Sequence, residues 1–199
     1  MINGVQFWND RKAYYSQSNN PTEAFLKATL NDRSGWLETC GPTSAVNCLA
    51  AMGKNVEIVC PGEYRPQPEE VLMDYFNDPR NKSVLSSIRK VDDSIPENRV
   101  PQFYPLAIYA VFMQLASFRW SLTFSDIVRH VTNGCAVQIC LKVPGHYLAV
   151  VAYDTNEKEL IYNDSWGERF PDGKGGWHRR MGWEEFANNV QNYFIVYGV

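Results

Sequence analysis

The chain has 199 residues, of which 45% are hydrophobic and 14% aromatic, and its formal net charge is −3 at pH 7. These values predict a globular protein with one domain over residues 1–199, and they exclude the strongly basic surface that nucleic-acid binding needs. The most apolar run, residues 105–118, is too short to span a membrane.

The first half of the chain predicts mainly helices. Residues 13–15 form a short β-prone run before turn residues. Apolar residues recur at helical spacing from Ala45 to Met52, and Gly53 follows as a stop signal. The other elements predicted here are a helix at residues 21–30, a short strand or extended connection at 56–60, a helix at 69–76, a polar surface excursion at 80–99 with one helical turn at 84–88, and a mostly buried helix at 106–118.

The second half predicts an antiparallel meander. Two tight turns, Pro144-Gly145 and residues 154–157, separate three apolar strands. Because helices precede this sheet, the predicted fold class is α+β. The elements predicted here are helices at residues 125–134 and 182–189 and strands at residues 135–143, 146–153, 159–164 and 193–199.

Cysteine usage indicates a reduced protein. The chain contains five cysteines, an odd number, and no Cys-X-X-Cys pair, which argues against a disulfide scaffold and against a standard zinc site. The first residues also lack a basic region followed by an apolar one, as a secretory signal would have. We therefore expect a cytoplasmic location. The cysteines are Cys40, Cys48, Cys60, Cys135 and Cys140.

Cys40 stands at the start of the helix that contains Ala45. Pro42 suits the first turn of a helix, because the N–H that proline lacks has no intrahelical partner there. Unpaired backbone N–H groups and the positive end of the helix dipole favour an anion at this position, and they lower the pKa of a thiol. A free cysteine is often only a small buried hydrophobe, so position alone leaves both interpretations of Cys40 open.

His146 opens one predicted strand and Asp164 closes the next. A three-residue loop between these strands would place His146 opposite Asp164 with both side chains on one face. A four-residue loop would shift the register by one, and Asn163 would share the face of His146 instead. Either partner could orient the imidazole. A histidine at the start of a buried strand could be a core residue, but in a chain with Cys40 this arrangement favours a nucleophile, a base and an orienting residue.

Four segments together resemble a papain-like cysteine peptidase, of the branch similar to bacteriocin-leader-processing peptidases. They are residues 14–20, 39–45, 134–154 and 162–167, in the family's order. The last contains Asp164-Ser165-Trp166-Gly167, where papain-type enzymes have Asn-Ser-Trp-Gly. The resemblance implies an α+β fold with an N-terminal helical part, whose nucleophile helix packs against a C-terminal antiparallel sheet. It implies no metal or organic cofactor.

The resemblance also implies a role for each site residue. Cys40 would be the nucleophile, His146 the base and Asp164 the orienting residue. Gln17 would donate its side-chain amide to the developing oxyanion, together with the backbone N–H of Cys40. Gln17 lies further upstream of Cys40 than is usual in the family, with residues 21–34 inserted between them. Either the insertion loops out and Gln17 returns to the site, or Asn31 or Ser34 serves in its place.

The resemblance implies hydrolysis of an amide bond through a thioester intermediate. Small stand-alone peptidases of this branch include phage and prophage cell-wall enzymes of the endolysin type. We therefore expect peptidoglycan stem or cross-bridge peptides as the substrate, with the enzyme released by lysis. The alternatives are an intracellular protease that processes one particular protein, and a catalytically silent papain-like module that binds peptides.

Overall fold

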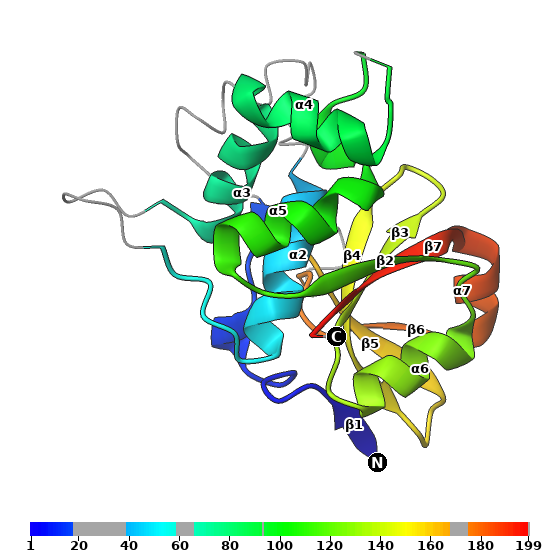
Figure 1. Cartoon of the computed structure of the whole chain (residues 1–199). Coiled ribbons are helices and arrows are strands. Elements are labelled where there is room, and N and C mark those ends of the chain that lie inside the picture. The colour runs from blue at the N-terminus through cyan, green and yellow to red at the C-terminus, as the bar shows by residue number, and fades with distance from the viewer. Residues whose placement is uncertain (18–38, 59–65, 93, 168–174, 199) are drawn as a thin grey trace.

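The computed structural model describes residues 1–17, 39–58, 66–92, 94–167 and 175–198. In this part of the chain a seven-stranded antiparallel sheet has helices on both faces (Figure 1). The helices are η1 (Arg11–Ala13), α2 (Cys40–Ala51), α3 (Pro68–Asn77), α4 (Pro79–Ile88), η3 (Glu97–Arg99), η4 (Pro101–Phe103), α5 (Tyr104–Phe112), α6 (Phe124–Thr132) and α7 (Trp183–Asn189). The strands are β1 (Ile2–Gly4), β2 (Ala116–Trp120), β3 (Val137–Leu141), β4 (Tyr147–Asp154), β5 (Glu159–Asp164), β6 (Arg179–Met181) and β7 (Val190–Tyr197).

The strand order is β2-β7-β3-β4-β5-β6, and β1 pairs with β4. The predicted meander is confirmed, because β3 pairs with β4 and β4 pairs with β5, in both cases antiparallel. The last predicted strand is β7, which lies inside the sheet between β2 and β3. The α+β fold class is thereby confirmed. Strands β1 and β6 are additions that the sequence analysis did not predict.

Two apolar cores explain why β4 is hydrophobic from Tyr147 to Tyr153. Neighbouring residues of a strand point to opposite faces of the sheet. Ala149 and Val151 belong to the core beneath α2, α3 and α5, whereas Leu148 and Val150 belong to the core beneath α6 and α7. Strand β4 therefore supports the helix that begins at Cys40 on one face and α6 on the other.

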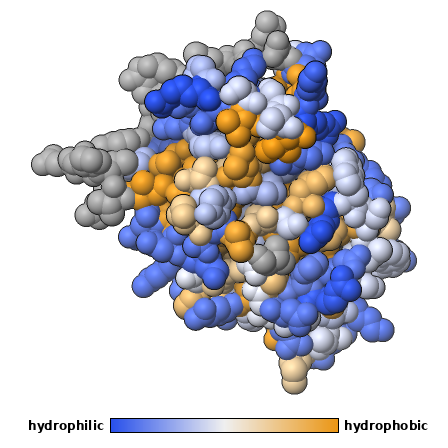
Figure 2. All heavy atoms as spheres, viewed as in Figure 1, coloured by the Kyte–Doolittle hydropathy of each residue, from blue (hydrophilic) through white to orange (hydrophobic). Residues whose placement is uncertain are grey.

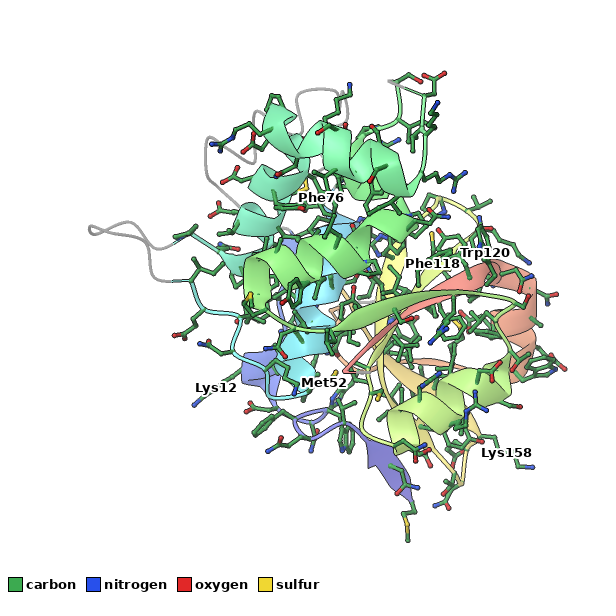
Figure 3. The ribbon with its side chains drawn as sticks, viewed as in Figure 1. Lys12, Met52, Phe76, Phe118, Trp120 and Lys158 are labelled. Atoms are coloured by element: carbon green, nitrogen blue, oxygen red, sulfur yellow. The ribbon has the colours of Figure 1, made fainter. Side chains whose placement is uncertain are left out.

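The predicted helix at residues 106–118 is wrong in its second half. Helix α5 ends at Phe112, because Met113 adopts a left-handed conformation with φ 55°. The chain then forms β2, from which Phe118 and Trp120 project as an edge-to-face pair with ring centroids 4.9 Å apart (Figure 3). Pairing with the distant β7 holds this segment as a strand. Figure 2 shows apolar side chains gathered over α5, and Met113 is one of the exposed residues there.

The excursion predicted at residues 80–99 lies at the surface in its first half, but the single helical turn predicted at 84–88 is part of a longer helix, α4. Asp78 caps this helix, since its carboxylate accepts a hydrogen bond from the Arg80 N–H at 2.9 Å. Pro79 occupies the first helical turn. The Asp78-Pro79 pair therefore starts a new helix immediately after α3.

Three other predicted elements have different outcomes. The helix at residues 69–76 is confirmed as α3. Residues 13–15 do not form a strand, and the described residues of the 56–60 segment are an extended connection rather than a strand. The helix predicted at residues 21–30 lies outside the described residues.

Candidate active site

Cys40 is the first residue of α2 and is partly exposed, whereas the residues that follow it in the first turns are buried. Burial of the sulfur raises the pKa of the Cys40 thiol. A hydrogen bond from His146, the positive charge of its ring and a backbone hydrogen bond from Tyr147 outweigh that effect, so the pKa is lowered overall. A lowered pKa favours the thiolate, which is the nucleophilic form of cysteine.

His146 lies between the nucleophile candidate and a carboxylate. Its Nε2 is 2.6 Å from Asp164 Oδ1, and both side chains are buried. Because Nε2 contacts Asp164, the other ring nitrogen is left to interact with the Cys40 thiol. Burial alone would lower the pKa of His146, but the hydrogen bonds to Asp164 and Cys40 and their charges raise it to about 10. The geometry favours a thiolate–imidazolium pair.

A β-bulge decides which residue contacts His146. The loop that closes the β4–β5 hairpin has four residues, because Asp154 pairs with Glu159. By itself this loop would place Asn163 on the face of His146. The register then shifts between Val150 and Ala152, and Leu148 pairs with Asp164. The extra residue in β4 brings Asp164 to His146. The three-residue loop is therefore wrong, although the partner that it predicted is the one that contacts the histidine.

Trp166 covers the histidine and supports its partner. The Trp166 ring lies 5.5 Å from the His146 ring, centroid to centroid, and the Trp166 N–H donates to Asp164 Oδ1 at 2.9 Å. A second backbone hydrogen bond fixes the peptide of Asp164, whose carbonyl accepts from the Tyr14 hydroxyl at 2.8 Å. Asp164 is thus held at its carboxylate oxygen Oδ1 by Trp166 and at its backbone carbonyl by Tyr14.

Gln17 lies beside Ser165, the residue that follows Asp164. Its N–H donates to the Ser165 carbonyl at 2.8 Å, and its Oε1 accepts from the Ser165 hydroxyl at 2.7 Å. With Oε1 on Ser165, the Nε2 of the same carboxamide carries the two N–H donors of the side chain. The insertion therefore does not separate Gln17 from Asp164. The alternative donors Asn31 and Ser34 lie outside the described residues.

Asn47 is a residue that the sequence analysis missed. It lies on α2, where its Oδ1 accepts from the Tyr15 N–H at 2.6 Å and its Nδ2 donates to the Tyr15 carbonyl at 3.0 Å. This pair of hydrogen bonds ties residues 14–17 to α2. The sequence feature that could have indicated its role is a polar residue within the apolar stretch of the helix that begins at Cys40.

The other described cysteines differ from Cys40. None of the four cysteines in the described ranges forms a disulfide, and Cys60 lies outside them. Burial raises the pKa of Cys48 and Cys135, and it raises that of Cys140 to about 11. In the part of the chain that the structure describes, Cys40 is thus the cysteine whose pKa is lowered.

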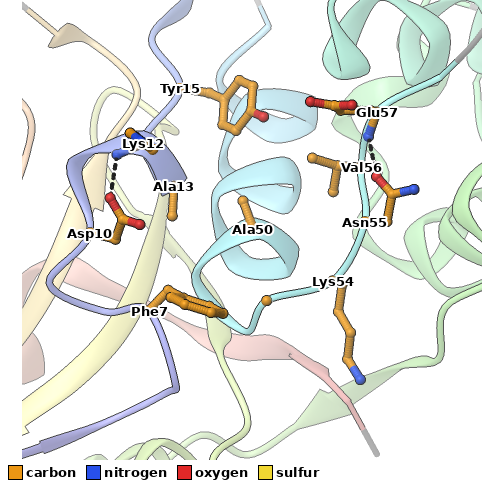
Figure 4. A pocket seen from close by; sticks show the side chains of 11 residues that line it. Phe7, Asp10, Lys12, Ala13, Tyr15, Ala50, Lys54, Asn55, Val56 and Glu57 are labelled. Carbon is orange, nitrogen blue, oxygen red and sulfur yellow. Dashed lines mark hydrogen bonds between the residues drawn. The ribbon is translucent and has the colours of Figure 1, made fainter.

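A separate groove lies at the other end of α2 (Figure 4). Ala50 and Lys54 line it from the helix side, and Phe7, Lys12 and Tyr15 line it from the N-terminal segment. Cys40 is not among its lining residues. This groove is therefore distinct from the candidate site at the start of α2.

The described residues contain no group of three or more His, Cys, Asp or Glu side chains placed to hold a metal ion. No helix among them is both long and apolar enough to cross a membrane.

Comparison with known proteins gives a family match. Residues 11–193 match the sequence profile of the family described as Peptidase_C39 like. Comparison with curated protein sequences finds no match. Among solved structures, UfSP from C. elegans is similar with a TM-score of 0.42 and 11% sequence identity, and the alignment covers 98% of this chain and 34% of the UfSP chain. The chain thus spans about a third of the length of that protein.

Proposed function

The chain belongs to the Peptidase_C39 like family, and we propose that this papain-like cysteine hydrolase cleaves peptide bonds with Cys40, His146 and Asp164 as its catalytic residues. The observation that carries the proposal is the placement of His146. Its Nε2 lies 2.6 Å from Asp164 Oδ1, and its interaction with the Cys40 thiol lowers the pKa of that thiol. A nucleophile, a base and an orienting group in this order are what acyl transfer requires.

The proposed reaction has two halves. The Cys40 thiolate attacks the carbonyl carbon and forms a tetrahedral intermediate. His146 then donates its proton to the leaving nitrogen, the C–N bond breaks, and a thioester remains on Cys40. In the second half a water molecule attacks the thioester while His146 takes a proton from it. The C–S bond then breaks, which releases the carboxylic acid product and restores the Cys40 thiolate. Asp164 keeps the imidazole oriented throughout.

We assign the oxyanion site to the backbone N–H of Cys40 and the side-chain amide of Gln17. Two contacts support this assignment: the hydrogen bonds of Gln17 to Ser165, which follows Asp164, and those of Asn47 to the segment that carries Gln17. Removal of one such donor typically lowers kcat by about 10²–10³.

The proposed substrates are peptidoglycan stem or cross-bridge peptides. In this proposal the protein is an endolysin-type enzyme of a phage or prophage, and cell lysis releases it. This part of the proposal rests on the resemblance to small stand-alone peptidases of the same branch, and not on a contact in the site.

The nucleophile is tested by alkylation with iodoacetamide, read by mass spectrometry at each cysteine. At pH 6 we expect Cys40 to react faster than Cys135, which is also partly exposed and whose pKa is raised. Cys40→Ala should fold with an unchanged circular dichroism spectrum and lose this fast phase and all hydrolysis. A wild-type Cys40 that reacts no faster than Cys135 would overturn the enzyme assignment and leave a peptide-binding module.

The substrate class is tested by turbidity clearing of purified sacculi. We expect wild-type protein to clear the suspension and to release new amino termini, and Cys40→Ala to do neither. If Cys40 reacts rapidly but the sacculi stay intact, peptidoglycan is the wrong substrate and processing of a particular protein takes its place.

A further inference from the structure

Strand β3 lies next to both halves of the proposed catalytic pair. At its end, the Leu141 N–H donates to the carbonyl of His146 at 2.8 Å, so β3 holds the backbone of the proposed base. Earlier on the same strand, Gln138 pairs with Ala149 of β4, and its side chain is buried beneath the start of α2. A single strand thus contacts the histidine at one point and the helix that begins at Cys40 at another.

Gln138 makes directional contacts with the first turn of that helix. Its Nε2 donates to the Gly41 carbonyl at 2.8 Å and to the Ser44 hydroxyl at 2.6 Å. Ser44 in turn donates to the Gly41 carbonyl at 2.9 Å. On the other side, Gln138 Oε1 accepts from the Tyr197 hydroxyl of β7 at 2.6 Å. Because a carbonyl can only accept, these partners leave one orientation for the amide.

The start of α2 depends on this external contact. Its N-cap residue, Thr39, makes no side-chain capping hydrogen bond within the described ranges, and Gly41 has no side chain with which to pack. The other contacts between α2 and the sheet are the backbone hydrogen bond from Tyr147 to the Cys40 sulfur and apolar packing, for example of Ala45 against the core that includes Ala149. Apolar packing is not directional, whereas hydrogen bonds fix position and angle.

We propose that Gln138 is a positioning residue, which sets the separation of the Cys40 sulfur and the His146 ring by fastening the first turn of α2 to β3. The inference rests on the proposed function, because it assigns Gln138 a role in that reaction. Gln138 acts through Gly41, the residue next to the nucleophile, and touches no reacting atom. Loss of the contact lets the helix start move relative to the strand that holds His146, and the ion pair weakens.

The test measures the rate of Cys40 alkylation by iodoacetamide from pH 4 to pH 10, which needs no substrate. In Gln138→Leu, which keeps the volume but removes the amide, we expect the rate at pH 6 to fall about tenfold and the pH midpoint to rise by about one unit. Tyr197→Phe removes only the hydroxyl that orients the amide and should give a smaller change in the same direction.

Val131→Ala is the control for loss of stability. Val131 is buried on α6 in the core on the opposite face of the sheet, so this variant should be destabilised and keep the wild-type profile. The inference is overturned if folded Gln138→Leu has the wild-type profile, or if Val131→Ala shifts the profile as much as Gln138→Leu does. If Gln138→Leu does not fold, Tyr197→Phe decides, and a wild-type profile there overturns the inference.

Failure of the proposed function itself is a different result in the same experiment. It would appear in the wild-type protein, as a Cys40 no more reactive at pH 6 than Cys135, and the positioning role would fall with it. A reactive wild-type Cys40 together with an unaffected Gln138→Leu would overturn the positioning role alone.

Discussion

At the scale of single residues, the proton on His146 links folding to pH. The pKa of His146 is raised above its ordinary value of 6.5, to about 10, although burial opposes this, because Asp164 and Cys40 stabilise the charged ring. A group whose pKa is raised by folding contributes stability that is complete below its unfolded pKa and is lost as the pH rises through its folded pKa. The window for His146 is therefore from about pH 6.5 to about pH 10.

We predict that the Tm of a Cys40→Ser protein falls across this window, and that it falls less when Asp164→Asn is added. The serine removes the titrating thiol, and with it the part of the rise in the His146 pKa that Cys40 causes. The part of that rise that Asp164 causes remains. The measurement is thermal unfolding by circular dichroism at pH 6.5, 8 and 10. Equal slopes in the two proteins would show that the contact with Asp164 does not hold the proton on His146.

At the scale of elements, the first turn of α2 is packed between the sheet and α5. On the α5 side, a Cβ added at Gly41 would lie 2.0 Å from the Tyr104 hydroxyl oxygen. That hydroxyl donates to the Asn98 carbonyl at 2.7 Å, so it has little freedom to move away. Gly41 is therefore needed for the close approach of α5 and not for an unusual backbone angle.

We predict that Gly41→Ala lowers the free energy of unfolding by about 1–3 kcal/mol, the usual range for overpacking a core. Adding Tyr104→Phe removes the nearest atom and should restore part of the loss, although the ring carbon at 3.1 Å remains. Urea unfolding of the two single variants and the double variant checks this. If the double variant loses more free energy of unfolding than the two single variants lose together, the close approach of Tyr104 to Gly41 is not the cause.

Element boundaries also show where local sequence was insufficient. The run at residues 106–118 is apolar throughout, and apolarity does not distinguish a buried helix from a strand. The left-handed Met113 and the pairing of β2 with β7 divide it. Similarly, Asp78-Pro79 has the sequence of a helix stop and of a helix start, and only the hydrogen bond from Arg80 shows that it starts α4.

At the scale of the whole molecule, the N-terminal segment connects the two sides of the site. Strand β1 pairs with β4, Tyr15 is bonded to Asn47 of α2, and Gln17 is bonded to Ser165 at the end of β5. One short segment thus contacts the helix that begins at Cys40 and the strand end that carries Asp164. This arrangement places Gln17 without any help from the residues that separate it from Cys40 in sequence.

We predict that Asn47→Ala lowers kcat about 10-fold or more but leaves the pH profile of Cys40 alkylation unchanged. Loss of the two hydrogen bonds releases the Tyr15 backbone and lets Gln17 move, and alkylation by iodoacetamide develops no oxyanion for Gln17 to stabilise. Gln17→Ala should lower kcat by more than Asn47→Ala does and should also leave the pH profile of Cys40 alkylation unchanged. An alkylation profile that shifts together with kcat would mean that Asn47 supports the Cys40–His146 pair instead.

The sequence by itself predicted the candidate site residues and determined the order of the main elements. Pro42 and the helical spacing of apolar residues indicated the helix that begins at Cys40. Three apolar runs separated by turn residues indicated β3, β4 and β5. These signals are local, because they depend on backbone preferences within a few residues. The strand ends with His146 and Asp164 could therefore be predicted to meet.

Only the tertiary structure decided how those residues are held. The bulge between Val150 and Ala152 selects Asp164 over Asn163 as the partner of His146. Such a one-residue shift of register depends on packing on both faces of β4. The contacts of Gln138 with Gly41 and of Gln17 with Ser165 join residues far apart in the chain. No local preference encodes such contacts, because they form only when the helix, the sheet and the N-terminal segment have packed together.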